Sequence, residues 1–436
     1  MLNLTYNYKI IPTKEQIDKI EHNLAVCKSV WNYALAERKL WSNSRSCPVN
    51  ACSIKSESIV QPFEYPTYHT QSANLTKAKK TNEFLKSGNA QAMQQTLRKL
   101  DRTFNDMKAK GCGFPRFKKR MKSFNLISNK IEVNSNKIKM PLLKQVRFVK
   151  SRKIPNGFKI KQVQIIKKAS GYYANLALEL DVNIPTPQPH GHAIGIDVGI
   201  QSMLATSDGL TVKRPAFLDN VLRQIKLLQR RLRNKKRGSN KYLKLQRRIA
   251  LLHEKVANKR KDYHFKLAHQ LCSQVGMIFV EEINFTAWSK GMFSKQSLDM
   301  GLGQFITTLE YVCSQSDTYF AKVNKDYTSQ VCPNCGVHTG KKDLNQRLHV
   351  CSECGYEQDR DVAAAEVVMK RGLTAVGAPV VKQPSHGKGL WAEFSSALYK
   401  PRRSVGGNYG CLDKSLNGNP LAFRQGRFKT AVALLE

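Results

Sequence analysis

Two pairs of cysteines constrain the fold of this chain more strongly than any other feature. Cys332-Pro-Asn-Cys335 is followed, after 15 intervening residues, by Cys351-Ser-Glu-Cys354. Each Cys-x-x-Cys turn presents two sulfurs together, and zinc binds a closed tetrahedron of such soft ligands. The spacing therefore predicts a zinc ribbon over residues 326–355, in which these four thiolates hold one structural Zn²⁺. Because all four coordination positions are filled, this metal cannot activate water, and any catalysis has to come from other residues.

The charge of the chain limits its partners. The 436 residues include 72 Lys+Arg and 32 Asp+Glu, which gives a formal net charge of +40. Self-repulsion on this scale is tolerable when a polyanion neutralises it, so nucleic acid is the expected partner. No apolar run approaches the ~20 residues of a membrane span, and the N-terminus lacks the basic-then-apolar pattern of a signal peptide. We therefore expect a cytoplasmic protein without a membrane partner.

The cations are concentrated in two segments. Residues 221–261 hold 16 Lys/Arg against one acid, Glu254, and carry two apolar stripes at helical spacing, which predicts a helical hairpin over residues 218–261 with one very basic face. The loop over residues 111–120 interleaves cations with Phe114 and Phe117, which suits phosphates and stacked bases, although a charge run is as often a solvated surface. The cations expected to bind nucleic acid are Arg116, Lys118, Lys119, Arg120, Arg230, Arg231, Arg233, Lys235, Lys236, Arg237, Lys241, Arg247 and Arg248.

The N-terminal half of the chain predicts an antiparallel sheet with inserted helices. Apolar and polar residues alternate over residues 2–9, 158–163 and 173–180, which is typical of half-buried strands. Thr13 and Gln16 form a capping-box pattern at the start of one helix, and apolar residues from Met93 to Met107 recur at helical spacing. The strands could close a small barrel, with the helices between residues 13 and 110 inserted into it.

Prolines and small polar residues mark the segments between the predicted domains. Three prolines predict a loop-rich insertion over residues 41–71, and its Cys47 and Cys52, which lack a second pair, are interpreted as isolated thiols. Three further prolines over residues 185–189 predict a stiff linker and a domain boundary near residue 190. The tail over residues 375–436 is rich in Gly, Pro and Ser, and we expect it to be poorly ordered.

Three acids stand where burial requires a partner. Asp197 interrupts the apolar strand 193–200, Glu281 follows the apolar strand 275–280, and Asp361 heads a predicted helix after the second cysteine pair. A buried carboxylate is costly unless it is paired or binds a metal, and oxygen ligands favour Mg²⁺ or Mn²⁺, which can support phosphodiester cleavage in pairs. Two alternatives stay open: Asp359 or Asp361 could merely cap the helix, and Glu282 competes with its neighbour Glu281.

The order of these motifs resembles the insertion-sequence TnpB (OrfB) family of bacteria over roughly residues 1–372. The resemblance rests on Gly195-Ile-Asp-Val-Gly199, Val280-Glu-Glu-Ile-Asn284, the cysteine pairs, Asp359-Arg-Asp-Val-Ala363, Ile11-Pro-Thr-Lys-Glu-Gln16, Trp31-Asn-Tyr-Ala-Leu35, Gly113-Phe-Pro-Arg-Phe-Lys118 and Lys261-Asp-Tyr-His-Phe-Lys-Leu267. Compact type V CRISPR effectors share the nuclease and zinc arrangement, and genomic context would separate the two groups.

The resemblance implies a fold of α/β and all-β parts. It comprises an oligonucleotide-binding-like wedge β-barrel (residues 1–12 and 121–188) with an inserted helical recognition lobe (13–120). An RNase H-like, RuvC-type nuclease domain follows (190–325 and 356–374), with the basic hairpin 218–261 and the zinc ribbon 326–355 within it.

The activity that the resemblance implies is RNA-guided cleavage of double-stranded DNA by two metal ions. Asp197, Glu281 and Asp361 would be the catalytic triad that binds Mg²⁺ or Mn²⁺, and a guide RNA from the transposon end would supply specificity by base pairing. We expect a monomer that associates with the nucleoid when it is bound to DNA. The alternatives are a non-catalytic nucleic-acid-binding regulator and a direct DNA transposase of the same element. The chain departs from the family at Ala363, where an asparagine is common, and this could weaken the metal geometry without removing a ligand.

Overall fold

The computed structural model describes residues 2–46, 64–127, 131–154, 157–182, 185–343 and 345–378. It divides the chain into two compact units, Met1–Ile184 and Pro185–Glu436, and each unit is described by itself. Cys47, Cys52 and all but the first four residues of the predicted tail lie outside the described residues. Among the described residues, no helix combines the length and the apolarity that a membrane span needs.

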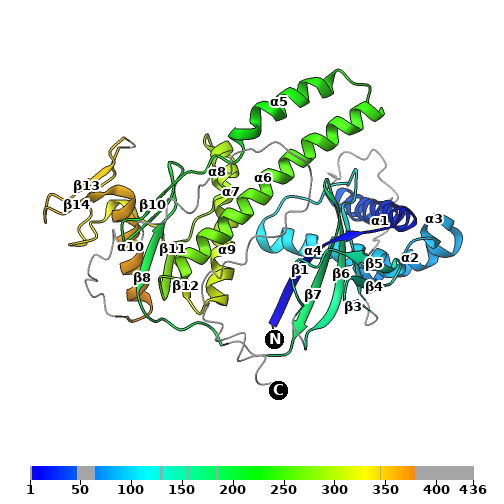
Figure 1. Cartoon of the computed structure of the whole chain (residues 1–436), viewed down its shortest axis with the longest axis horizontal. Coiled ribbons are helices and arrows are strands. Elements are labelled where there is room, and N and C mark those ends of the chain that lie inside the picture. The colour runs from blue at the N-terminus through cyan, green and yellow to red at the C-terminus, as the bar shows by residue number, and fades with distance from the viewer. Residues whose placement is uncertain are drawn as a thin grey trace, which may run out of the picture. The chain divides into compact units, whose positions relative to one another are not determined.

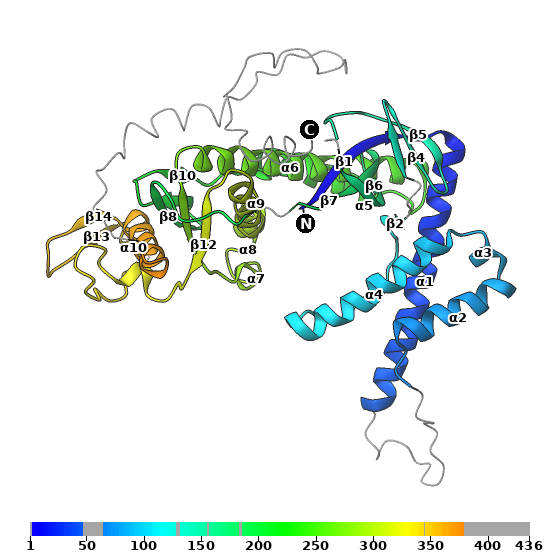
Figure 2. The ribbon, with the colours of Figure 1, turned by 90° about the horizontal axis from the view of Figure 1, so that it is seen from below.

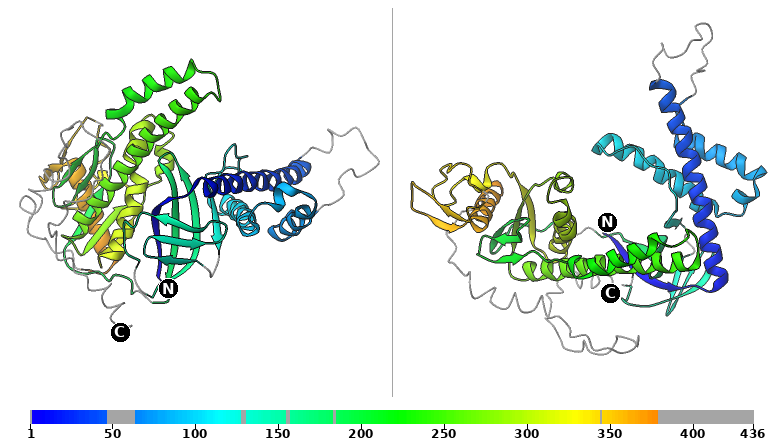
Figure 3. Two further views of the ribbon diagram at one scale, coloured as in Figure 1. Left: turned by 45° about the vertical axis from the view of Figure 1, so that its right-hand side comes forward. Right: turned by 90° about the horizontal axis from the view of Figure 1, so that it is seen from above.

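The first unit contains a seven-stranded antiparallel sheet (Figures 1 and 3). Its hydrogen-bonded order is β2-β6-β7-β1-β5-β4-β3, so β2 and β3 are the edge strands. Among the described residues, these two strands do not pair with each other to close the predicted barrel. β1 pairs with β7 from Leu2 opposite Leu180 to Ile10 opposite Tyr172. The strands are β1 Leu2–Ile11, β2 Ser123–Ile127, β3 Glu132–Asn134, β4 Lys137–Met140, β5 Lys144–Phe148, β6 Lys159–Lys168 and β7 Gly171–Leu180.

Four helices connect β1 to β2: α1 Lys14–Ser46, α2 Tyr68–Thr81, α3 Glu83–Lys86 and α4 Ala90–Lys110. The predicted capping box is present, because the backbone N–H of Thr13 donates to Gln16 Oε1 (3.0 Å) and that of Gln16 donates to Thr13 Oγ1 (3.4 Å). The apolar face of α4 packs on α1 around the buried Trp31. The predicted loop over residues 41–71 was wrong at both ends, where α1 extends to Ser46 and α2 begins at Tyr68.

The second unit is built on a five-stranded sheet of order β10-β9-β8-β11-β12. β8, β11 and β12 are parallel, whereas β9 and β10 run antiparallel to their neighbours. Buried side chains on both faces explain the apolar sequences of β8 and β11, whereas the edge strand β12 carries the exposed Lys322. The strands are β8 Ala193–Asp197, β9 Ser202–Thr206, β10 Thr211–Lys213, β11 Met277–Glu281 and β12 Tyr319–Val323.

Helices cover both faces of this sheet (Figure 2). Alternation along β11 sends Ile278 and Val280 toward the core with α6 and α9, and Met277 and Phe279 toward α10. The elements between and after the strands are α5 Asp219–Arg233, α6 Asn240–Cys272, α7 Phe285–Trp288, α8 Ser294–Met300, α9 Leu302–Gln315, η2 Thr328–Gln330, β13 Leu348–Val350, β14 Glu357–Asp359 and α10 Arg360–Ala375.

α10 packs on the sheet at unusually short range because two glycines permit it. A Cβ on Gly195 of β8 would lie 2.0 Å from the backbone oxygen of Ala365, and a Cβ on Gly372 of α10 would lie 2.1 Å from the Phe279 ring. The close approach fixes the N-terminus of α10, and therefore Asp361, relative to the strands.

Candidate metal centres and nucleic-acid interface

The register of two parallel strands brings the first two predicted acids together. Val280 of β11 is paired with Ile196 of β8, so Glu281 and Asp197 follow at the same end of neighbouring strands. Both side chains point toward α10, because side chains alternate along a strand. Asp197 lies on the same face of β8 as Ala193, and Glu281 on the same face of β11 as Met277 and Phe279, which pack on α10. Glu282 has the opposite parity and is exposed, which favours Glu281 among the two alternatives.

The third acid lies at the N-terminus of α10, on the same side of the sheet. Asp359 is the N-cap residue: its Oδ1 accepts hydrogen bonds from the backbone N–H groups of Asp361 (2.9 Å) and Val362 (3.3 Å). The carboxylate of Asp361 is therefore not needed as a cap and instead accepts a hydrogen bond from Ser202 on β9. The open question about this pair is thus resolved with Asp359 as the cap.

Two of the acids act electrostatically on the third, Asp197. Burial raises the pKa of Asp197 well above its usual range, and the charges of Glu281 and Asp361 raise it further. Burial also raises the pKa of Glu281 and of Asp361. A cluster of carboxylates that is costly to ionise together is stabilised by a divalent cation, so the donor set fits Mg²⁺ or Mn²⁺.

Two arginines that the sequence analysis missed lie near these acids. The charges of Arg347, from the predicted ribbon segment between the two cysteine pairs, and of Arg360, the first residue of α10, lower the pKa of Asp361. The backbone N–H of Arg360 donates to the backbone oxygen of Arg347 (2.7 Å), and its guanidinium donates to the oxygen of Asp343 (3.0 Å). Only the folded ribbon brings Arg347 to the acids, so spacing along the chain gave no signal for it.

The four predicted zinc ligands form one cluster. The Sγ atoms of Cys332, Cys335, Cys351 and Cys354 all lie within 4.8 Å of one another, a set that fits a tetrahedral zinc ion. Among the described residues, no other group of three or more potential ligands is so compact. The carboxylate oxygens of the three acids, which all belong to the described part of the chain, do not all lie within this distance of one another.

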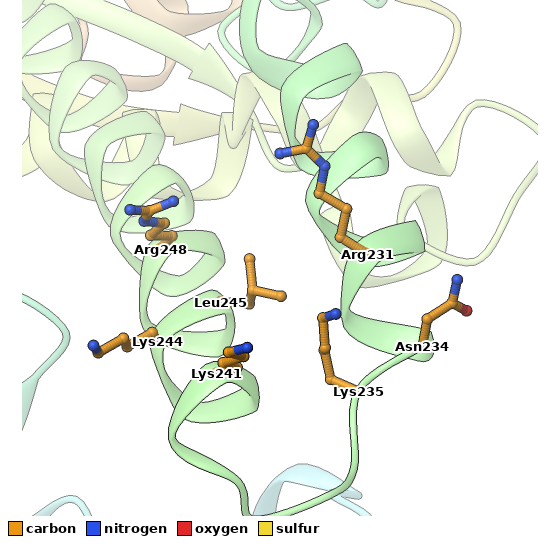
Figure 4. Close-up of a pocket in the computed structure, with 7 residues that line it drawn as sticks. All are labelled: Arg231, Asn234, Lys235, Lys241, Lys244, Leu245 and Arg248. Carbon is orange, nitrogen blue, oxygen red and sulfur yellow. The ribbon is translucent and has the colours of Figure 1, made fainter.

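The predicted basic hairpin consists of α5 and α6, joined by a short turn (Figure 1). Ile225, Leu228 and Val256 are buried, whereas all nine predicted nucleic-acid contacts on the hairpin are exposed. A groove of about 490 Å³ runs between the helices (Figure 4), lined by Arg231, Asn234, Lys235, Lys241, Lys244, Leu245 and Arg248. In Figure 4 Leu245 points across the groove, with Arg231 and Lys235 on one side and Lys241 and Arg248 on the other. Such a groove fits a phosphate backbone.

The second predicted basic segment is a loop fastened to α1. The side chain of Asn32 forms two hydrogen bonds with the backbone of Lys118. Its Oδ1 accepts from the Lys118 N–H (2.8 Å), and its Nδ2 donates to the Lys118 backbone oxygen (3.1 Å). The Lys118 ammonium lies 3.2 Å from the centre of the Trp31 ring, and burial lowers the pKa of this lysine to about 8. Lys118 is thus engaged within the protein, whereas Arg116, Lys119 and Arg120 are exposed.

Three family models match the chain, in order. They are described as a helix-turn-helix domain over residues 1–46, a probable transposase of the IS605 OrfB type over residues 175–291, and a Cas12f1-like TNB domain over residues 303–368. "Putative RNA-guided DNA endonuclease" of Streptomyces pristinaespiralis is 26% identical, over 92% of this chain and 97% of its own length. "Putative RNA-guided DNA endonuclease InsQ" of Escherichia coli K12 is 25% identical, over 87% and 97% respectively. The chain belongs to the IS605 OrfB (TnpB) family.

A solved structure supports the fold of this OrfB-family protein. The Cas12f1 chain in a complex with sgRNA and target DNA aligns with a TM-score of 0.50 at 14% identity, over 82% of this chain and 83% of that one. One family description does not match the local structure. Residues 2–46 form strand β1 and the single helix α1, so the described part of this segment contains no helix-turn-helix.

Proposed function

We propose that this protein is an RNA-guided DNA endonuclease of an insertion element, in which Asp197, Glu281 and Asp361 form the catalytic centre. The observation that carries the proposal is the convergence of three acids from separate chain segments on one side of the sheet. The charges of Glu281 and Asp361 raise the pKa of the buried Asp197, and burial raises the pKa of all three. The family and the two full-length relatives supply the reaction class.

The three carboxylates would hold Mg²⁺ or Mn²⁺ at the carboxyl ends of β8 and β11. Two such ions, when bound, activate a water molecule and stabilise the leaving oxygen of a phosphodiester. Arg347 and Arg360 lie close enough to act on the charge of Asp361, so they can also attract and orient a scissile phosphate. The zinc ion of the ribbon would have a structural role, because four thiolates would fill all of its coordination positions.

The sheet of the second unit supports an RNase H-like assignment, because its order β10-β9-β8-β11-β12 combines three parallel strands with two antiparallel pairings, β8 with β9 and β9 with β10, at one edge. We assign residues 1–12 and 121–188 to the wedge domain, 13–120 to the recognition lobe, and 326–355 to the ribbon within a nuclease domain. The exposed cations of the hairpin suit guide RNA and heteroduplex, which are recognised through backbone charge. The guide would come from the transposon end, and the protein would act as a monomer.

The decisive experiment is cleavage of target DNA by the co-purified RNA–protein complex in Mg²⁺ and in EDTA. We expect Asp197→Ala and Glu281→Ala to abolish cleavage, by more than about 10³-fold, because each removes a metal ligand, while RNA binding stays unchanged. Glu282→Ala is the matched control, since it removes the exposed neighbour of opposite parity and should retain activity. Persistent cutting by Asp197→Ala would contradict the proposal.

The same assay separates the alternatives. The family description as a probable transposase favours direct cleavage of element ends as the competing function. Cutting of element ends without RNA would support that function, and guide-dependent binding without any cutting would support a non-catalytic regulator. Sequencing of the co-purified RNA, together with a transposon end or a repeat array beside the gene, would separate this protein from a type V effector.

A further inference from the structure

Glu281 is held by a hydroxyl from the entrance of the zinc ribbon. Oγ1 of Thr328 donates a hydrogen bond to Oε1 of Glu281 (2.5 Å), and this bond lowers the pKa of the carboxyl against the effect of burial. Thr328 is itself buried, with 6% of its surface exposed. The bond is short, its acceptor is half-buried, and Oγ1 also lies 3.2 Å from the backbone oxygen of Lys325, so Thr328 has little rotational freedom and restricts where the carboxylate of Glu281 points.

The two residues that follow Thr328 are hydrogen-bonded to the segment just after the first cysteine pair of the ribbon. The backbone oxygen of Gln330 accepts two hydrogen bonds from Thr339, from its N–H (2.7 Å) and its hydroxyl (3.0 Å). The backbone oxygen of Ser329 accepts a bond from Lys342 Nζ (3.1 Å). The residue before Thr328, Tyr327, adopts a left-handed conformation with φ of 59°, which turns the chain back toward the sheet.

A short covalent path therefore links the two centres, since Cys332 follows Thr328 by four residues. A carboxylate that ligates a metal needs a partner that holds its orientation, and loss of such a partner usually weakens metal affinity. No cysteine of the ribbon has to touch the carboxylate for this coupling, because the hydroxyl of Thr328 reaches it.

We infer that Thr328 is a positioning residue that couples the folded zinc ribbon to the metal affinity of the carboxylate centre. The inference rests on the proposed function, since it takes Glu281 as a metal ligand. It assigns the ribbon a second task besides its own stability: the ribbon orients a ligand of the nuclease centre.

The test uses the full-length chain, freed of RNA, with Mn²⁺ as the probe. Thr328→Val removes the hydroxyl and keeps the branched shape, whereas Thr328→Ser keeps the hydroxyl. Thr308→Val is the matched control, because this buried threonine of the same unit bonds only the backbone oxygen of Gln304 (2.8 Å). Mn²⁺ binding is measured by electron paramagnetic resonance, with Asp197→Ala as the baseline for a damaged centre.

We expect Thr328→Val to weaken Mn²⁺ binding about 10–100-fold and to raise by a similar factor the Mg²⁺ concentration for half-maximal cleavage. At saturating Mg²⁺ its kcat should approach that of the wild type, and Thr328→Ser and Thr308→Val should bind Mn²⁺ as the wild type does. Wild-type Mn²⁺ affinity in Thr328→Val, or equal losses in Thr328→Ser and Thr308→Val, would overturn the inference alone. Mn²⁺ binding that ignores Asp197→Ala would overturn the proposed centre itself.

Discussion

At the scale of single residues, His264 shows how burial sets a protonation state. This histidine of α6 is fully buried, and its Nε2 donates a hydrogen bond to the backbone oxygen of Met300 (2.9 Å). Burial, together with the smaller effect of the Arg260 charge, lowers the pKa of His264 to about 4, against the opposing effect of the hydrogen bond to Met300. The side chain is therefore neutral at physiological pH, and it links α6, which carries the basic face, to the end of α8.

This shift predicts an acid sensitivity. Between pH 6.5 and 4 the unfolded chain binds a proton at His264 that the folded chain does not, so stability is complete above pH 6.5 and falls as the pH drops. At pH 5 the loss should be about 2 kcal/mol. In His264→Gln, which keeps a donor for Met300 without a titrating group, the melting temperature should fall less between pH 7 and pH 5 than in the wild type. Parallel curves would contradict the assignment.

At the scale of elements, the proposed centre depends on how closely α10 approaches β8. Gly195→Ala would place a Cβ 2.0 Å from the oxygen of Ala365, so α10 has to move and carry Asp361 with it. We expect a loss of about 3 kcal/mol in the free energy of unfolding, together with a larger loss of cleavage than the stability change explains.

Gly291→Ala is the control for this helix displacement. A Cβ at Gly291 would meet only the oxygen of Trp288, at an ordinary 3.9 Å. The two variants are compared by chemical denaturation and by cleavage below their melting temperatures. Equal activity in Gly195→Ala and Gly291→Ala would show that the position of α10 is not critical.

The elements also show how far sequence reasoning reached. Periodicity predicted α4, β6, β7 and the two hairpin helices, because each has a strong apolar pattern of its own. The cysteine spacing predicted the metal cluster for the same local reason. The sequence alone could not show which face of β11 meets α10, and therefore which of Glu281 and Glu282 points there, nor the contacts of Thr328 and Arg347. These features arise only when distant segments pack.

At the scale of the whole molecule, the charge of +40 predicts strongly salt-dependent binding. Each phosphate contact contributes about 0.7–0.9 to the slope of log K against log salt concentration. Changing Arg231, Lys241 and Arg248, which line the groove of the hairpin, to glutamine should lower the magnitude of this slope by about 2–3 for a single-stranded RNA oligonucleotide.

A second triple variant has the same change in net charge and serves as the control. Lys19, Lys110 and Lys266 already pair with Glu15 (2.5 Å), Asp106 (2.9 Å) and Asp262 (2.8 Å). Their replacement by glutamine should leave the slope within about one unit of the wild-type value. If both variants reduce the slope equally, net charge rather than the groove governs binding.

Because the proposed centre is assembled from three segments, its acids are synthesised at different times. Asp361 follows Glu281 by 361 − 281 = 80 residues. At a synthesis rate of about 5–20 residues per second, roughly 4–16 s pass on the ribosome between these two acids. A nascent chain that has already completed its basic hairpin can thus attract RNA before it is able to cut DNA. RNA binding can therefore precede completion of the carboxylate centre.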